Sequence, residues 1–144
     1  MIEQDTIKLL RECDAGVKMG ISSINEVIDY AHSEQLKNSL VNCKTEHEQF
    51  ADEMQALLNR YSDEGKDPNP IAKGMSWIKT NVMLSVNDSD AIIADLMTDG
   101  CNMGVKSLSK YLNEYKAADE DSKNIAKRII TSENKLADEV RAFL

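Results

Sequence analysis

Residues 45–58, TEHEQFADEMQALL, recur 86 positions later as residues 131–144, TSENKLADEVRAFL. Six of the fourteen positions are identical, and most of the others exchange a residue for a similar one. One exchange is not conservative, because His47 of the first copy becomes Glu133 of the second. The repeat predicts a duplicated helical segment, and this exchange is its most informative difference.

The composition predicts one helical domain with an acidic surface. The chain has 144 residues with two prolines and six glycines, and 25 acidic against 17 basic side chains give a formal net charge of −8. Few helix breakers and many Leu, Ala, Glu and Lys residues favour helices over sheet. An acidic surface repels phosphate backbones, and no run of Lys or Arg marks a local exception, so we expect no nucleic-acid partner.

Hydropathy and cysteine usage predict a cytoplasmic protein. No apolar run approaches the roughly 20 residues that a membrane-spanning helix needs, so we expect no membrane partner. The N-terminal residues MIEQDTIKLL lack the basic-then-apolar order of a signal peptide. Cys13, Cys43 and Cys101 are odd in number and have no CxxC spacing, which favours reduced thiols in a reducing compartment.

Apolar residues at alternating steps of three and four predict four long amphipathic helices. We expect them over residues 5–31, 34–62, 90–116 and 122–143. Ser33 is the expected N-cap of the second helix, and Asp88 or Ser89 that of the third. Because one or two residues separate the first two helices, these must form an antiparallel hairpin.

The segment between the second and third helices interrupts this pattern. Residues 63–70, DEGKDPNP, carry two prolines and Gly65, the expected C-cap, and residues 71–85 read as a short helix. The single domain, residues 1–144, is therefore expected to divide as follows: a hairpin over 5–62, a crossover over 63–88 and a second hairpin over 89–144. The crossover is expected to run the length of the bundle.

Aligning the two hairpins by their repeats predicts the levels of the core. Met19-Gly20-Ile21 of the first helix corresponds to Met103-Gly104-Val105 of the third. This alignment predicts Cys13 level with Met97, and Ile24 level with Leu108. It also predicts one polar level between them: Gly20, His47, Gly104 and Glu133. A buried, unpaired carboxylate costs several kcal/mol, so His47 is the expected partner of Glu133.

Several interpretations of this polar level stay open. His47 and Glu133 form a hydrogen-bonded pair that fixes helix register, or they hold a metal ion. Alternatively, a small ligand fills space left by Gly20 and Gly104, or the register is off by one position and one polar side chain points to solvent. The three cysteines are expected at different levels, which argues against a shared thiolate metal site.

The duplicated hairpin with a long crossover resembles the ferritin-like proteins. More narrowly, the chain is similar to bacterial four-helix-bundle proteins of unknown function in that superfamily. The similarity lies in the opening L-L-x-x-C-D-x-G-V, the helix H-E-Q-F-A-D-E-M-Q-A-L-L, and W-I-K…N-D-x-D-A-I-I over residues 77–93. It covers nearly the whole chain and implies an all-α, ferritin-like antiparallel four-helix bundle.

The family's di-iron site is not matched. Ferritin-like di-iron proteins carry a Glu on each of two helices and Glu-x-x-His on each of the other two. Here Lys44 stands three positions before His47, and Leu136 stands three positions after Glu133. Two potential ligands cannot hold a di-iron centre, so we expect the site to be lost or reduced.

The expected function is therefore non-catalytic. The resemblance implies a structural or protein-interaction role, in a stress-related setting, with no cofactor. The expected partner is another protein or a second copy of the chain, as a homodimer. The alternative is a metal-binding protein that holds a single iron, manganese or zinc ion on His47 and Glu133.

Overall fold

The computed structural model describes residues 2–65 and 89–144, and these residues form helices and turns with no strand among them. Four long helices are present: α1 (Ile2–Val27), α2 (Glu34–Asn59), α4 (Ser89–Glu114) and α5 (Glu120–Val140). Two short 3-10 turns follow α1 and α5: η1 (Ile28–Tyr30) and η2 (Arg141–Phe143). The all-α class is thereby confirmed. The short helix expected over 71–85 lies outside the described residues.

Local side chains explain where the helices begin. Ser33 is the N-cap of α2, as expected, because its hydroxyl accepts from the amide of Leu36 at 3.3 Å. Asp119 does the same for α5 by accepting from the amide of Ser122 at 2.9 Å, so this helix begins at Glu120, two residues before the predicted start.

The end of α2 differs from the prediction. Gly65 was the expected C-cap, but the first left-handed residue after the helix is Ser62, with φ of 54°. The amide of Asp63 bonds the carbonyl of Leu58 at 3.1 Å, and the amide of Ser62 bonds that of Asn59 at 3.2 Å, which is the Schellman pattern. Gly65, at φ of +87°, lies instead against the carboxylate of Asp14 on α1.

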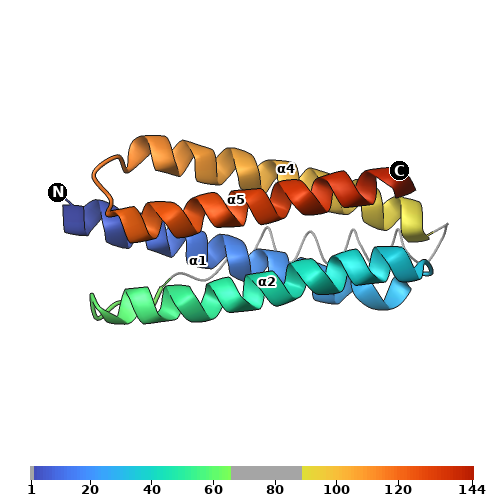
Figure 1. Cartoon of the computed structure of the whole chain (residues 1–144), viewed down its shortest axis with the longest axis horizontal. Coiled ribbons are helices and arrows are strands. Elements are labelled where there is room, and N and C mark those ends of the chain that lie inside the picture. The colour runs from blue at the N-terminus through green and yellow to red at the C-terminus, as the bar shows by residue number, and fades with distance from the viewer. Residues whose placement is uncertain (1, 66–88) are drawn as a thin grey trace.

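The four helices lie side by side along one long axis (Figure 1). The end of α2 returns to the first half of α1, where Arg11 bonds Asp63 at 2.5 Å. The start of α4 lies at the opposite end of α1, where the Ser89 hydroxyl donates to the carbonyl of Tyr30 at 2.5 Å. The chain therefore leaves the first hairpin at one end and enters the second at the other, as expected of the crossover.

This path changes the predicted levels of the core. Two clusters of buried side chains fill the bundle, one toward each end. The first cluster contains Ile24 together with Met97, and the second contains Cys13 together with Leu108. The predicted pairing of Cys13 with Met97 and of Ile24 with Leu108 is therefore wrong. A repeat identifies corresponding residues but not the direction in which the second copy lies, and here the second hairpin is inverted.

Inversion exchanges the two ends of a hairpin but leaves its middle in place. The polar level is that middle, which is why His47 of the first hairpin and Glu133 of the second still meet. Within each hairpin, Gly20 lies against His47 and Gly104 against Glu133. Within the described part of the chain, no helix is both long and apolar enough to cross a membrane.

Candidate functional site

The structure brings His47 of α2 and Glu133 of α5 together in the middle of the bundle. The exposed fraction is 1% for His47 and 7% for Glu133, so both side chains are buried. The interpretation in which one of them points to solvent is therefore wrong. His47 also packs edge-on against Phe50, with ring centroids 5.9 Å apart.

The two groups face each other at the distance of an ion pair. His47 Nε2 lies 3.8 Å from Glu133 Oε1, which is too long for a direct hydrogen bond. The other ring nitrogen, Nδ1, lies 3.0 Å from the backbone carbonyl oxygen of Cys43. A carbonyl only accepts, so Nδ1 carries a proton and donates it. The expected pair is present, but without the expected direct hydrogen bond.

The surroundings of His47 favour its charged form. Burial alone lowers the pKa of the imidazole, but the contacts with Cys43 and Glu133 outweigh it and raise the pKa from 6.5 to about 10. At neutral pH the ring is therefore an imidazolium with a proton on each nitrogen. Its positive charge faces the Glu133 carboxylate inside an apolar core.

Glycine on the neighbouring helices makes this arrangement sterically feasible. A Cβ atom on Gly20 would lie 3.0 Å from His47 Cδ2, and one on Gly104 would lie 2.8 Å from Glu133 Cδ. The two polar side chains thus already fill the space above the glycines. The interpretation of a ligand pocket at Gly20 and Gly104 is therefore wrong.

One carboxylate oxygen of the His47–Glu133 pair, Glu133 Oε2, is buried and has no hydrogen-bond partner among the described residues. A buried carboxylate oxygen without a donor is unfavourable, and such groups are few in folded proteins. It is the most unusual polar atom of the polar level.

His47 and Glu133, the candidate metal ligands, lack a third protein ligand among the described residues. Among residues 2–65 and 89–144, no three His, Cys, Asp or Glu side chains are grouped so that they could hold a metal ion. All three cysteines are buried and free. Burial, with smaller contributions from nearby acidic groups, raises the pKa of Cys13 and of Cys101 to about 12, so both stay neutral thiols.

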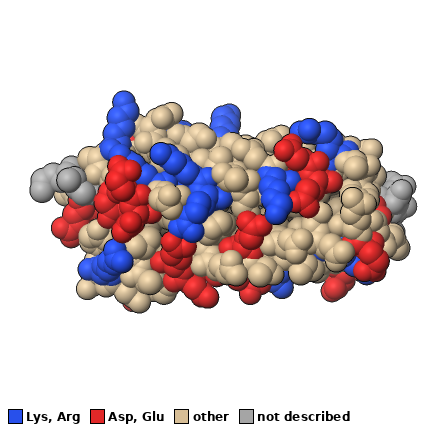
Figure 2. Space-filling model, in the orientation of Figure 1, with Lys and Arg blue, Asp and Glu red and all other residues tan. Residues whose placement is uncertain are grey.

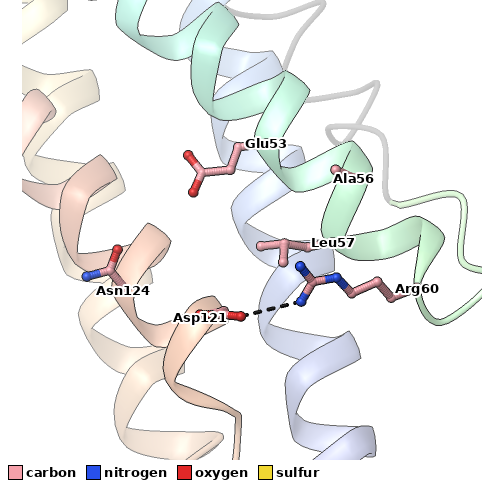
Figure 3. Close-up of a pocket in the computed structure, with 6 residues that line it drawn as sticks. All are labelled: Glu53, Ala56, Leu57, Arg60, Asp121 and Asn124. Carbon is pink, nitrogen blue, oxygen red and sulfur yellow. Dashed lines mark hydrogen bonds and ion pairs between the residues drawn. The ribbon is translucent and has the colours of Figure 1, made fainter.

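Among the hollows that the described residues form at the surface, two differ in charge character. The first has a volume of about 250 Å³ and is lined by six residues: Glu53, Ala56, Leu57, Arg60, Asp121 and Asn124. Arg60 reaches across it to Asp121, with 3.4 Å between Nη1 and Oδ2 (Figure 3). Glu53 bonds Arg128 of α5. Each charged group that lines this hollow therefore has an oppositely charged partner.

The second hollow is larger, about 440 Å³, and open to solvent between α4 and α5. It is lined by six residues: Ser109, Leu112, Asn113, Lys116, Lys123 and Lys127. This hollow was not predicted from the sequence because its lysines do not form a run. Their spacings of seven and four become one surface only through the turn from α4 to α5, although Lys123 and Lys127 do share a helix face.

Comparison of the chain with protein-family models, curated proteins and solved structures finds no match. The central pair and the surface are therefore the features from which function is inferred. Of the residues singled out from the sequence, His47, Glu133, Gly20 and Gly104 meet at one level.

Proposed function

We propose that this chain is a ferritin-like, antiparallel four-helix bundle with a non-catalytic, structural or protein-interaction role. In this proposal the His47–Glu133 ion pair holds the two hairpins in register. The proposal extends to a cytoplasmic protein with a stress-related role in bacteria, a setting that rests on the family resemblance alone.

One observation carries the structural role of the pair. His47 and Glu133 occupy the same position in the two copies of the repeat, and their side chains are 3.8 Å apart. Two equivalent residues can meet only near the axis that relates the two copies, as in an isologous dimer interface. A one-residue slip of α2 against α5 would separate the charges inside the core, so the pair opposes other registers.

The closed centre supports a role without catalysis. Both members of the pair are less than 10% exposed, and the glycines beside them are covered by the pair itself. A substrate would have to open the core to reach them. The bundle therefore acts through its outer surface, where Met103 is 69% and Val41 45% exposed.

Light scattering at micromolar concentrations tests the interaction role. A mass of twice the chain's 16.1 kDa is expected if the partner is a second copy, and cross-linking in cells is expected to capture another protein if it is not. A monomer that forms no cross-link in cells would contradict the proposal.

A second function, the binding of one iron, manganese or zinc ion, is favoured by Glu133 Oε2, which has no partner among residues 2–65 and 89–144. The bond from His47 Nδ1 to a backbone carbonyl also resembles the bonds that orient metal-binding histidines. This function requires loss of the Nε2 proton and further ligands from solvent or a partner. Stoichiometric metal in protein purified without an affinity tag, absent from a His47→Ala variant, would favour it over the structural role.

A further inference from the structure

We propose that the hollow between α4 and α5 binds a small anion that carries two phosphoryl groups. The lysine hollow, as we call it, comprises the six residues Ser109, Leu112, Asn113, Lys116, Lys123 and Lys127. This site is separate from the central pair and does not depend on the function proposed above.

The lysines of the hollow lack the carboxylate partners that some other lysines of the bundle have. Lys18 pairs with Asp14 at 2.8 Å, and Lys135 pairs with Glu46 at 3.6 Å. No ion pair joins Lys116, Lys123 or Lys127 to a carboxylate in the part of the chain that the structure describes. Three unneutralised ammonium groups around one hollow are unexpected in a chain with a net charge of −8.

Charge convergence makes the lysine hollow attractive to anions. A concave surface lined by one sign of charge concentrates the field and raises the local concentration of counter-ions. Several Lys and Arg side chains lie over α4 and α5 in the space-filling view, with Asp and Glu side chains among them (Figure 2). The contrast is the hollow of Figure 3, where Arg60 already has Asp121 as its partner.

The lining chemistry favours phosphate over carboxylate. Lysine binds phosphate as a compact point charge with three donors, and a phosphoryl group carries up to twice the charge of a carboxylate, so a cluster of lysines attracts it more strongly. Ser109 and Asn113 add a hydroxyl and an amide donor, and Leu112 adds an apolar wall. Each phosphoryl group carries about 1.5 to 2 negative charges at neutral pH, so two of them supply about three to four, enough to neutralise three lysines.

The backbone between the lysines is held in place before any ligand binds. The amide of Ala117 donates to Asp5 at 3.0 Å, and the amide of Asp119 donates to the Thr6 hydroxyl at 2.8 Å. Both bonds tie the turn from α4 to α5 to the first turns of α1. Because the turn is already ordered, little conformational entropy is lost when a ligand binds.

Titration of the ¹⁵N-labelled protein with inorganic pyrophosphate tests the proposal. At about 0.1 M salt the Debye length is about 10 Å, so attraction by distant charges is screened. Saturable chemical-shift changes are expected for amides that surround the lysine hollow, within residues 109–127. The Lys123→Gln/Lys127→Gln variant is expected to bind about tenfold more weakly or worse, which corresponds to a loss of at least about 1.4 kcal/mol.

The same helix hairpin offers a matched control. Lys106 and Lys110 are both exposed, lie four residues apart on α4, and do not line the hollow. The Lys106→Gln/Lys110→Gln variant makes the same change in net charge and is expected to bind within about twofold of wild type, since only screened long-range attraction is lost. Unchanged thermal unfolding of both variants would show that neither substitution disturbs the fold.

Two outcomes would overturn the proposal. One is equal weakening by the two double variants, and the other is shift changes spread over all surface lysines, since both indicate general attraction of anions. Citrate and inorganic phosphate serve as further probes. Weaker binding of both than of pyrophosphate is expected, whereas citrate binding as tightly as pyrophosphate would contradict the phosphoryl assignment.

Discussion

The two copies of the repeat build the same contact from different chemistry. In the first hairpin an imidazole lies against Gly20, and in the second a carboxylate lies against Gly104. Both hairpins share one backbone arrangement, since each has a glycine directly against its polar side chain. The electrostatics differ, because His47 has a backbone acceptor for Nδ1, while one oxygen of Glu133 has no donor in the part of the chain that the structure describes.

The inverted packing explains why the copies differ at this position. Equivalent residues of the two hairpins meet at the middle level, so identical side chains there would face their own kind. Two carboxylates, or two imidazolium groups, at this distance would repel each other. One member of such a like-charged pair would therefore become neutral. A histidine opposite a glutamate replaces that repulsion by attraction. The difference between the copies is therefore what lets a polar level exist at their axis.

Making the two copies alike is expected to have the largest effect. His47→Glu would set two buried carboxylates against each other, and the free energy of unfolding is expected to fall by about 3–5 kcal/mol at neutral pH, as when a buried pair loses one partner. Urea denaturation followed by circular dichroism measures this fall.

The charge swap His47→Glu/Glu133→His is the control for that variant. It restores one cation and one anion across the axis, and most of the lost stability is expected to return. If the swap is no more stable than His47→Glu alone, the pair does not act through its charges, and the account of the polar level is wrong.

The sequence predicted which residues form the central pair, His47 and Glu133, but not how the helices around the pair pack. Helical periodicity predicted the four helices and the burial of His47, because an inward stripe is a local property. The predicted levels of Cys13 and Ile24 were wrong because alignment by the repeats gives both hairpins the same direction, whereas a crossover along the bundle inverts the second one. The 3.8 Å distance between His47 Nε2 and Glu133 Oε1 depends on side-chain packing between α2 and α5. So does the lack of a partner for Glu133 Oε2 among the described residues. The lysine hollow could not be predicted because its residues form one surface only when the turn from α4 to α5 is folded.

Alkaline pH is expected to weaken the pair by a few kcal/mol. The folded pKa of His47, about 10, exceeds the value of 6.5 for a free imidazole. The stabilisation is therefore complete below pH 6.5 and is lost as pH rises toward 10, by at most about 1.4 kcal/mol per pH unit. A His47→Gln variant is expected to lack this slope, so the difference in unfolding free energy between wild type and variant isolates it.

The pH window can be chosen to exclude the cysteines. The pKa of Cys13 and Cys101 is raised from 9.0 to about 12, so these thiols add a further loss of stability only above about pH 9. A difference between wild type and His47→Gln that stays constant from pH 6.5 to pH 9 would contradict the raised pKa of His47.

The two glycine contacts are expected to differ in how they tolerate a methyl group. In Gly104→Ala the new Cβ would lie within 2.8 Å of Glu133 Cδ, and the buried carboxylate would have to move. We expect a loss of about 1–3 kcal/mol. Gly20→Ala is expected to cost less, because the His47 ring lies 3.0 Å away or farther and needs to shift by only a few tenths of an ångström.

Gly100→Ala is the matched control for both glycine variants. Gly100 lies one turn before Gly104 on the same helix, and a Cβ there would have nothing within 4 Å. Alanine is favoured over glycine in a helix by about 1 kcal/mol, so this variant is expected to raise the thermal midpoint. If Gly104→Ala raises it equally, close approach is not the reason for glycine at the polar level.

The smallest effect is expected where the repeat reaches the surface. Glu53 and Glu139 are equivalent residues: Glu53 pairs with exposed Arg128, and Glu139 accepts from the buried hydroxyl of Ser39 at 2.6 Å. An exposed ion pair contributes about 0.2–1 kcal/mol and is screened by salt, so Glu53→Gln is expected to cost little at low salt and less as salt rises.

Glu139→Gln leaves a buried hydroxyl with a weaker acceptor and is expected to cost about 1 kcal/mol at any salt concentration. Thermal unfolding of both variants across a salt series separates the two, and parallel salt dependence would show that the copies contribute alike at the surface.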